Sequence, residues 1–255
     1  MLPQARKRFG QHFLTDRHYL ARIVEAIDPR PGQHMVEIGP GPGALTELLI
    51  GHLDHLDVVE IDRNLAAGLR ATFPVEKVSV HQGDVLDFDF ASLPAPLRVV
   101  GNLPYNISTP ILFRVAASAE RICDCVFMLQ KEVVERMVAA PGSAEYGRLS
   151  VMLQYRFEMA CAFKVPPGAF TPPPKVDSAV VRMKPLGPDR LRARDEALFA
   201  RIVTAAFSQR RKTLANALKP LELRVAPAGA GIDPRRRGET LSVHEFVALA
   251  EVQSG

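Results

Sequence analysis

The sequence predicts an α/β fold with a mostly parallel, seven-stranded sheet, followed by a small all-helical domain. Short apolar runs typical of buried strands alternate with helical patterns between residues 35 and 140, which indicates consecutive β/α units. The composition changes after Pro185, and from Asp195 onward the apolar residues recur at helical spacing. The segment Asn102-Leu103-Pro104-Tyr105 directly follows an expected strand, so it lies at the carboxyl edge of the sheet, where open α/β folds bind ligands.

The first part of the chain is expected to form five β/α units. Thr15 or Asp16 can cap a first helix, and Asp28-Pro29 ends it. Strands are then expected at 35–38, 56–61, 78–81, 97–101 and 124–130, and helices at 44–50, 109–118 and 132–140.

A pair of antiparallel strands is expected after these units. Strand-like segments occur at 149–157, 160–165 and 176–183. Between residues 165 and 176 lie five prolines, which exclude both a helix and a strand inside a sheet. We therefore expect a stiff surface loop that presents Phe170 beside Lys175.

The length of 255 residues allows one large domain and a smaller one, which we place at 1–185 and 186–255. The sequence has no apolar run of about 18 residues that could span a membrane, and its amino terminus lacks the apolar core of a secretory signal. The three cysteines fit neither a disulfide framework nor a common zinc site. We expect a cytoplasmic protein with reduced thiols and no metal.

Positive charge is concentrated near the two ends of the chain. Residues 1–22 contain five Arg and Lys against one acidic residue, and residues 201–238 contain nine against two, although the net charge is only +4. A solvated basic helix face is the alternative, but consecutive cations point in different directions around a helix and cannot all join one internal salt bridge. We expect contact with nucleic-acid phosphates through Arg6, Lys7, Arg8, Lys175, Arg210, Arg211 and Lys212, with Phe170 among them.

A glycine-rich turn follows the first expected strand of the sheet. Gly39 and Gly41 lie between this strand and a helix, a pattern that brings a ligand close to the backbone. Glu60 lies about twenty residues further on, where an acid accepts ribose hydroxyls in dinucleotide-binding folds. Asp84 could accept a hydrogen bond from an adenine amino group or could cap a turn. The pattern also fits G-x-G-x-x-A, so a nicotinamide dinucleotide remains an alternative ligand.

The segment Asn102-Leu103-Pro104-Tyr105 can form a socket for the N6 amino group of adenine. The Asn102 side-chain oxygen and the carbonyl of Leu103 or Pro104 can accept its two hydrogens, and Tyr105 offers a face on which an unstacked base can lie. An ordinary strand-to-helix turn is the alternative. We expect these four residues to be catalytic through positioning and electrostatics, without a nucleophile.

The residues discussed above lie within longer motifs or are joined by them. These motifs are KRFGQHFL (7–14), VEIGPGPGALT (36–46), VEID (59–62), GNLPYNIST (101–109), YGRLSV (146–151), FTPPPKVDSAVVR (170–182) and FSQRRKTL (207–214). On these motifs the chain resembles the ribosomal RNA adenine N6,N6-dimethyltransferases, specifically the bacterial group that acts on 16S rRNA of the small subunit. The resemblance implies a Rossmann-like methyltransferase domain with a basic amino-terminal arm, and a carboxyl-terminal helical domain that binds RNA or the ribosome.

The same resemblance implies S-adenosyl-L-methionine as the methyl donor. Its substrate would be two adjacent adenosines near the 3′ end of 16S rRNA in the 30S subunit, modified by a monomer late in subunit biogenesis. By position, it carries cofactor contacts over to His12, Leu14, Gly39, Gly41, Glu60, Asp84 and Asn102.

One motif departs from the family pattern, which usually has Gln-Asn-Phe where this chain has Gln11-His12-Phe13. A backbone contact from position 12 would survive this change, whereas a side-chain contact need not. Three alternatives remain: the large-subunit dimethyltransferase linked to macrolide resistance, a nicotinamide-dependent dehydrogenase, and a non-catalytic assembly or transcription factor on the same fold.

Overall fold

The computed structural model describes residues 11–209 and 211–253. The chain forms two compact units: residues up to 134 together with 159–185 make unit 1, and residues 135–158 together with those from 186 onward make unit 2. This division differs from the one expected at residue 185, because residues 135–158 group with the carboxyl-terminal part of the chain.

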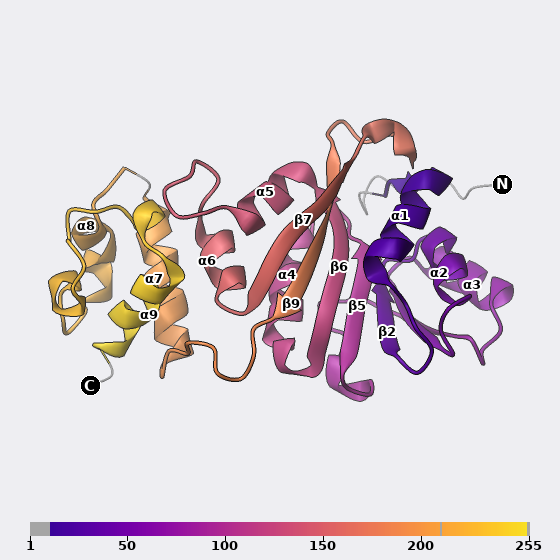
Figure 1. Ribbon diagram of the computed structural model, residues 1–255, viewed down its shortest axis with the longest axis horizontal. Helices are drawn as coiled ribbons and strands as arrows, with labels where there is room; N and C mark the ends of the chain where they lie inside the picture. The colour runs from indigo at the N-terminus through magenta and orange to yellow at the C-terminus, as the bar shows by residue number, and fades with distance from the viewer. Residues whose placement is uncertain (1–10, 210, 254–255) are drawn as a thin grey trace. The chain divides into compact units, whose positions relative to one another are not determined.

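Unit 1 contains the predicted seven-stranded, mostly parallel sheet, which the structure confirms (Figure 1). The strand order is β4-β3-β2-β5-β6-β9-β7; the strands from β4 to β6 pair in parallel, and β6 pairs with β9 antiparallel. The chain proceeds from β2 outward to β4 and then returns to β5 on the other side of β2, so a topological switch point lies between β2 and β5. The strands are β2 His34–Ile38, β3 Leu56–Glu60, β4 Val78–Gln82, β5 Leu97–Asn102, β6 Ile122–Gln130, β7 Phe157–Val165 and β9 Ser178–Pro185.

Helices cover both sides of this sheet, with α1 and α4 on opposite faces (Figure 1). The amino end of α1 is capped by Asp16, whose carboxylate accepts hydrogen bonds from the backbone N–H groups of His18 and Tyr19. Leu20, Ile23 and Ile27 of α1 are buried in the core. The helices of unit 1 are α1 Arg17–Ile27, α2 Ala44–Leu49, α3 Arg63–Thr72 and α4 Ser108–Ala117, and α5 Lys131–Val138 leads into unit 2.

The arm before α1 is held by the proline-rich segment. β1 (Phe13–Leu14) pairs antiparallel with β8 (Phe170–Thr171), and the N–H groups of Thr15 and Asp16 both donate to the Ala169 carbonyl. The expectation that Phe170 is presented at the surface is wrong: it is only 3% exposed and packs in the core of unit 1. Pairing with β1 points alternate side chains to opposite sides, which turns Phe170 inward. Lys175 is exposed, as expected.

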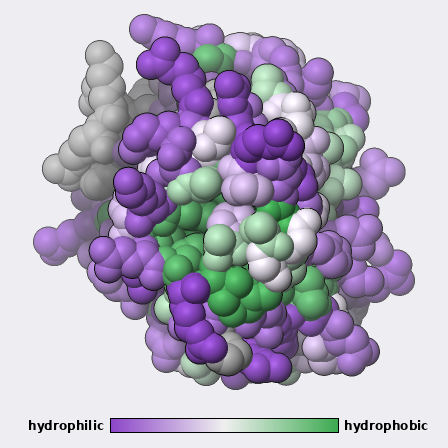
Figure 2. All heavy atoms as spheres, turned by 90° about the vertical axis from the view of Figure 1, so that its left-hand side faces the viewer, coloured by the Kyte–Doolittle hydropathy of each residue, from purple (hydrophilic) through white to green (hydrophobic). Residues whose placement is uncertain are grey.

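Unit 2 is helical around its own apolar core, and the helices are α6 Arg148–Gln154, α7 Glu196–Ser208, α8 Leu214–Leu218 and α9 Val243–Glu251. Phe199, Phe246 and Leu241 are fully buried in this core. Leu221, Leu223 and Ala230 are only partly buried against it. Figure 2 shows one face of the molecule, on which apolar residues form a patch surrounded by hydrophilic residues.

The strand expected at 149–157 is a helix, α6, over most of its length. Leu149, Val151 and Leu153 alternate as in a strand, but Ser150 between them is buried too. The Ser150 hydroxyl accepts a hydrogen bond from the N–H of Gly147, the N-cap of α6, and donates one to the Arg136 carbonyl. These bonds stabilise the first turn of a helix, so the segment is helical although its apolar residues alternate as in a strand.

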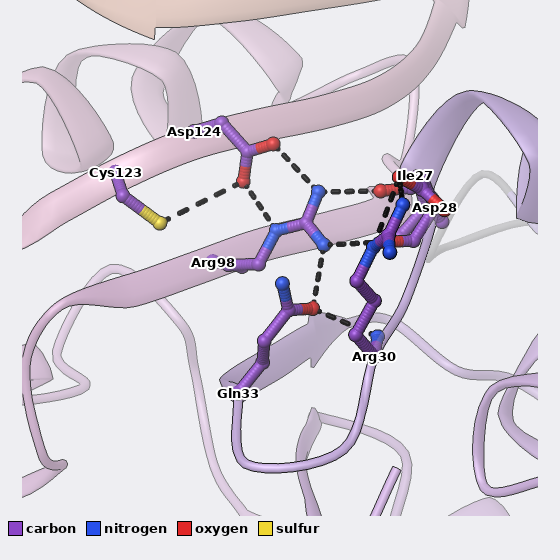
Figure 3. A network of polar contacts seen from close by, with 7 residues as sticks. All are labelled: Ile27, Asp28, Arg30, Gln33, Arg98, Cys123 and Asp124. Carbon is purple, nitrogen blue, oxygen red and sulfur yellow. Dashed lines mark hydrogen bonds and ion pairs between the residues drawn. The ribbon is translucent and has the colours of Figure 1, made fainter. Parts of the chain in front are cut away.

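A buried arginine closes the amino end of β5 (Figure 3). Arg98 is 6% exposed, and its guanidinium binds both oxygens of Asp124 on β6 at 2.7 and 2.6 Å. It also donates to the Gln33 side chain at 2.7 Å and to the backbone carbonyls of Ile27 and Asp28 at the end of α1. These bonds join α1, β5 and β6.

No helix in the described ranges is long and apolar enough to cross a membrane.

Candidate active site

A pocket opens in unit 1 at the carboxyl ends of β2, β3 and β5, at the switch point of the sheet. Most of its lining residues come from five segments that are far apart in the sequence. They are the arm (11–14), the glycine turn (37–42), the end of β3 (59–61), the turn after β4 (83–85) and the end of β5 (101–105). The structure therefore brings together all the predicted cofactor-contact residues.

Close approach to a neighbouring segment requires glycine at two positions that line the pocket. Gly41 has a left-handed φ of +58°, and a Cβ there would lie 3.3 Å from the Phe13 ring. A Cβ on Gly101 would lie 2.3 Å from the Ile38 carbonyl oxygen, so only glycine allows β5 to run this close to β2. At these two glycines the pocket is therefore lined by backbone.

Glu60 forms part of the pocket wall and holds the glycine turn in place. One carboxylate oxygen accepts from the Gly41 N–H at 3.1 Å and the other from the Asp62 N–H at 2.8 Å. Burial raises the pKa of Glu60, although these two hydrogen bonds act in the opposite direction. Its expected contact with a ribose stays a prediction.

Glu37 also lines the pocket, and its place there was not predicted from the sequence. It is 2% exposed, and its carboxylate accepts a hydrogen bond from the Thr46 hydroxyl at 2.6 Å. Burial raises the pKa of Glu37 to about 7. An acidic residue inside the apolar run 35–38, directly before the glycines, was the available signal.

Asp84 lies in the pocket wall. Its side chain also caps the turn in which it lies, since Oδ1 accepts a hydrogen bond from the Leu86 N–H at 2.9 Å. The turn-capping alternative is therefore present in the structure. A contact of Asp84 with an adenine amino group remains a prediction.

The residues at the end of β5 differ in how their polar groups are used. The Asn102 side-chain N–H₂ donates to the His12 carbonyl at 3.1 Å, and the Leu103 N–H donates to the Met128 carbonyl at 3.0 Å. The Pro104 carbonyl accepts from the Ile107 N–H at 3.3 Å. Within the described residues, the Asn102 Oδ1 and the Leu103 carbonyl have no hydrogen-bond donor, so these two oxygens are the acceptors that remain for a ligand.

Tyr105 is held at both its hydroxyl and its ring. The hydroxyl lies 2.5 Å from Ser178 Oγ on β9. The ring stacks on the His12 imidazole, with 5.6 Å between the ring centroids and 26° between the planes. His12 therefore occupies one face of the Tyr105 ring. Burial raises the pKa of Tyr105, opposed by the hydrogen bond to Ser178.

The sequence model of the ribosomal RNA adenine dimethylase family matches residues 3–253. This chain belongs to that family. It is 59% identical over 247 residues to the ribosomal RNA small subunit methyltransferase A of Aromatoleum aromaticum, and the match covers 96% of this chain and 93% of the relative. It is 58% identical to the protein of the same name from Chromobacterium violaceum, with coverage of 96% and 94%.

Solved structures show the same fold as this chain. A dimethyladenosine transferase from Plasmodium falciparum superimposes with a TM-score of 0.79 at 24% identity, covering 93% of this chain and 96% of that one. The 23S rRNA methyltransferase ErmE superimposes with a TM-score of 0.71 at 27% identity, covering 95% and 100%.

The predicted RNA-contact residues are distributed over both units. Arg6, Lys7, Arg8 and Arg210 lie outside the described residues. Arg211 and Lys212 are exposed in the turn before α8. The 233–237 segment lies beside this turn, because the Leu214 and Ala215 N–H groups donate to the Arg236 and Pro234 carbonyls.

The three consecutive arginines at 235–237 each pair with an acidic residue of unit 2. Arg235 pairs with Asp233 at 2.9 Å, and Arg237 lies 4.0 Å from Glu239. Arg236 pairs with Glu245, whose side chain also accepts from the Ser242 N–H in a capping box. These arginines therefore also have contacts within the fold, which the sequence pattern did not indicate.

Proposed function

We propose that this dimethylase family member transfers methyl groups from S-adenosyl-L-methionine to the N6 amino groups of two adjacent adenosines near the 3′ end of 16S rRNA in the small ribosomal subunit. The observation that carries the proposal is the pair of acceptor oxygens, Asn102 Oδ1 and Leu103 O, at the end of β5 beside the glycine turn. The names of the relatives at 58 and 59% identity support the choice of rRNA subunit.

The pocket residues fit the methyl donor. The turn at Gly39 and Gly41 leaves backbone where side chains would fill the space, and Glu60 and Asp84 place carboxylates in the wall for hydroxyl and amino groups. His12 and Leu14 close the pocket from the arm. When bound, S-adenosyl-L-methionine supplies an electrophilic methyl group on sulfur.

Asn102 and Leu103 would prepare the adenine nitrogen for attack. The N6 lone pair is conjugated into the ring, and two acceptors that hold the amino hydrogens favour the pyramidal nitrogen whose lone pair is free. The same oxygens stabilise the positive charge that develops on nitrogen as the N–C bond forms. The proton leaves after transfer, and the monomethylated amine retains one N–H for a second round. Of the two carbonyls considered, Leu103 is favoured because Pro104 already accepts from Ile107.

The alternatives fit less well. The large-subunit enzyme ErmE is 27% identical to this chain, whereas the two small-subunit relatives named above are 59 and 58% identical. A nicotinamide-dependent dehydrogenase would explain the glycine turn but not the acceptors at Asn102 and Leu103. An assembly role could accompany catalysis, and it would not need these two acceptors.

Unit 2 would supply contact with the ribosomal RNA. Arg211 and Lys212 are exposed and have no ion-pair partner within the described residues, so their charge is available to phosphates. Lys175 would add a contact from unit 1. We further propose that the protein acts as a cytoplasmic monomer, late in subunit assembly.

The test uses small subunits that lack the modification. Incubation with the enzyme and S-adenosyl-L-methionine is expected to give N6,N6-dimethyladenosine at two adjacent positions, identified by mass. S-adenosyl-L-methionine, and not NAD, is expected to raise the melting temperature. Unmodified subunits after incubation, or methylation only of large-subunit rRNA, would overturn the proposal.

A further inference from the structure

His12 contacts the segment Asn102 to Tyr105 through both its backbone and its side chain. Its carbonyl accepts from the Asn102 side chain at 3.1 Å. Its ring stacks on Tyr105, and its Nδ1 lies 2.9 Å from the Pro172 carbonyl. Because a carbonyl can only accept, Nδ1 carries the proton in this contact. The imidazole is thus held in place over Tyr105.

The two rings are too close together to admit a base between them. A planar base needs a carbon–carbon contact of about 3.5 Å on each side, so two rings that sandwich it stand about 7 Å apart. The observed separation of the His12 and Tyr105 centroids is 5.6 Å. A base that stacks on this face of Tyr105 must therefore displace the imidazole.

The backbone of His12 is fixed independently of its ring. The next two residues form β1 with β8, and Thr15 and Asp16 bind the Ala169 carbonyl. The Asn102 contact involves only the His12 carbonyl, and it points the Asn102 nitrogen at the arm, which leaves Oδ1 as the acceptor. A side-chain rotation of His12 can therefore uncover Tyr105 and leave the acceptor oxygens where they are.

We propose that the His12 imidazole is a removable cover on the base-stacking face of Tyr105, and that the target adenine binds by displacing it. The inference rests on the proposed function. It makes His12 a positioning residue, which controls how the target adenine binds on Tyr105. Breaking the ring contact and the bond to Pro172 lowers the apparent affinity for the base. The hydrogen bonds that an amino group makes with Asn102 Oδ1 and Leu103 O compensate for this loss.

The test compares His12→Asn with His12→Phe on unmodified small subunits. His12→Asn keeps the backbone carbonyl and removes the ring, so the KM for the subunit is expected to fall about two- to tenfold, the range of one aromatic pair. His12→Phe keeps a ring over Tyr105 and is expected not to lower this KM. The dissociation constant for S-adenosyl-L-methionine measures whether the arm itself is intact. Both variants keep the backbone of residue 12, so this constant stays within about twofold if position 12 contacts the cofactor through its backbone alone.

A second measurement uses the unaltered protein and adenosine 5′-monophosphate as the probe. The ring-proton NMR signals of His12, assigned by comparison with His12→Asn, are expected to lose the ring-current shift of Tyr105 at saturating probe. An unchanged or higher subunit KM in His12→Asn, an equal fall in His12→Phe, or His12 signals that stay in place would overturn the inference. Wild-type enzyme that leaves subunits unmodified would instead refute the proposed function.

Discussion

The two ends of strand β5 use polar groups in opposite ways. At the amino end, Arg98 is buried and its guanidinium binds a carboxylate, an amide oxygen and two backbone carbonyls (Figure 3). At the carboxyl end, only four residues later, Asn102 Oδ1 and Leu103 O have no donor within the described residues. The polar groups at the amino end are hydrogen-bonded within the protein, whereas two acceptor oxygens at the carboxyl end remain for a ligand. The residues expected to stabilise the fold and those expected to act in catalysis therefore lie at opposite ends of one strand.

This difference gives the two ends opposite mutational signatures. A buried charge that loses its partners destabilises the fold, because its desolvation is no longer compensated. A pocket acceptor that is not needed by the fold can be removed with little loss of stability, but the transition state then lacks a stabilising contact. We therefore expect variants at the amino end to lose stability and variants at the carboxyl end to lose catalytic rate.

The largest expected effect is on stability, from Arg98→Ala. It leaves Asp124 and the end of α1 without their donor, and the free energy of unfolding is expected to fall by about 3–5 kcal/mol. Chemical denaturation measures this change. Below the melting temperature, kcat on subunits is expected to stay near that of the wild type.

The double variant Arg98→Met/Asp124→Leu provides the control, because it removes both charges together. It is expected to recover part of the lost stability, since a buried ion pair can be replaced by apolar side chains at little cost. A loss of kcat in folded Arg98→Ala, at unchanged stability, would contradict the separation of the two ends.

The next effect is on catalysis, from Asn102→Ala. It removes one of the two acceptors, and kcat is expected to fall by about 10²–10³-fold with the fold intact, by analogy with the loss of one polar group that stabilises a transition state. Asn106→Ala is the matched control, because Asn106 is exposed in the same turn and does not line the pocket. Equal methylation by wild type and Asn102→Ala would refute the role of the acceptor.

The carboxyl end of β5 could be predicted from the sequence and the amino end could not. The ligand end consists of contiguous segments with their own chemistry, such as the glycine turn and Asn102 to Tyr105. Arg98 occurs in an apolar strand, and its partners Gln33 and Asp124 are far away in the chain, so no local pattern links them. Long-range packing also explains the two wrong predictions, the surface position of Phe170 and the strand at 149–157, since β1 and Arg136 decide these conformations.

His12 falls between these two cases. Its place beside the site followed from its motif, but stacking on Tyr105 depends on the pairing of β1 with β8, which the proline-rich sequence did not reveal.

Glu37 combines the properties of both ends, because it is a buried polar group that lines the ligand pocket. Its pKa is about 7 in the folded protein and about 4.5 in the unfolded chain. Between these values the folded state binds more protons, so the free energy of unfolding falls as the pH rises from about 4.5 to about 7, by up to about 3 kcal/mol. Glu37→Gln is expected to flatten this pH dependence, which urea unfolding at several pH values measures. Glu47→Gln, a change at an exposed carboxylate on α2, is expected to leave it unchanged.

The smallest expected effect concerns the basic residues of unit 2, where satisfied and unsatisfied groups again lie close together. Arg211 and Lys212 are exposed without an ion-pair partner among the described residues, whereas Arg235 and Arg237 already face Asp233 and Glu239. Arg211→Gln/Lys212→Gln is expected to weaken subunit binding and to reduce the slope of log K against log salt by about 1 for each phosphate that is no longer neutralised. Arg235→Gln/Arg237→Gln removes the same charge and is expected to change the slope less, because ion pairs within the fold compete with phosphate for these two side chains. Equal slopes for the two variants would mean that Arg235 and Arg237 exchange their ion pairs with Asp233 and Glu239 for contacts with RNA phosphates. An ion pair within the fold would then not prevent an arginine from binding RNA.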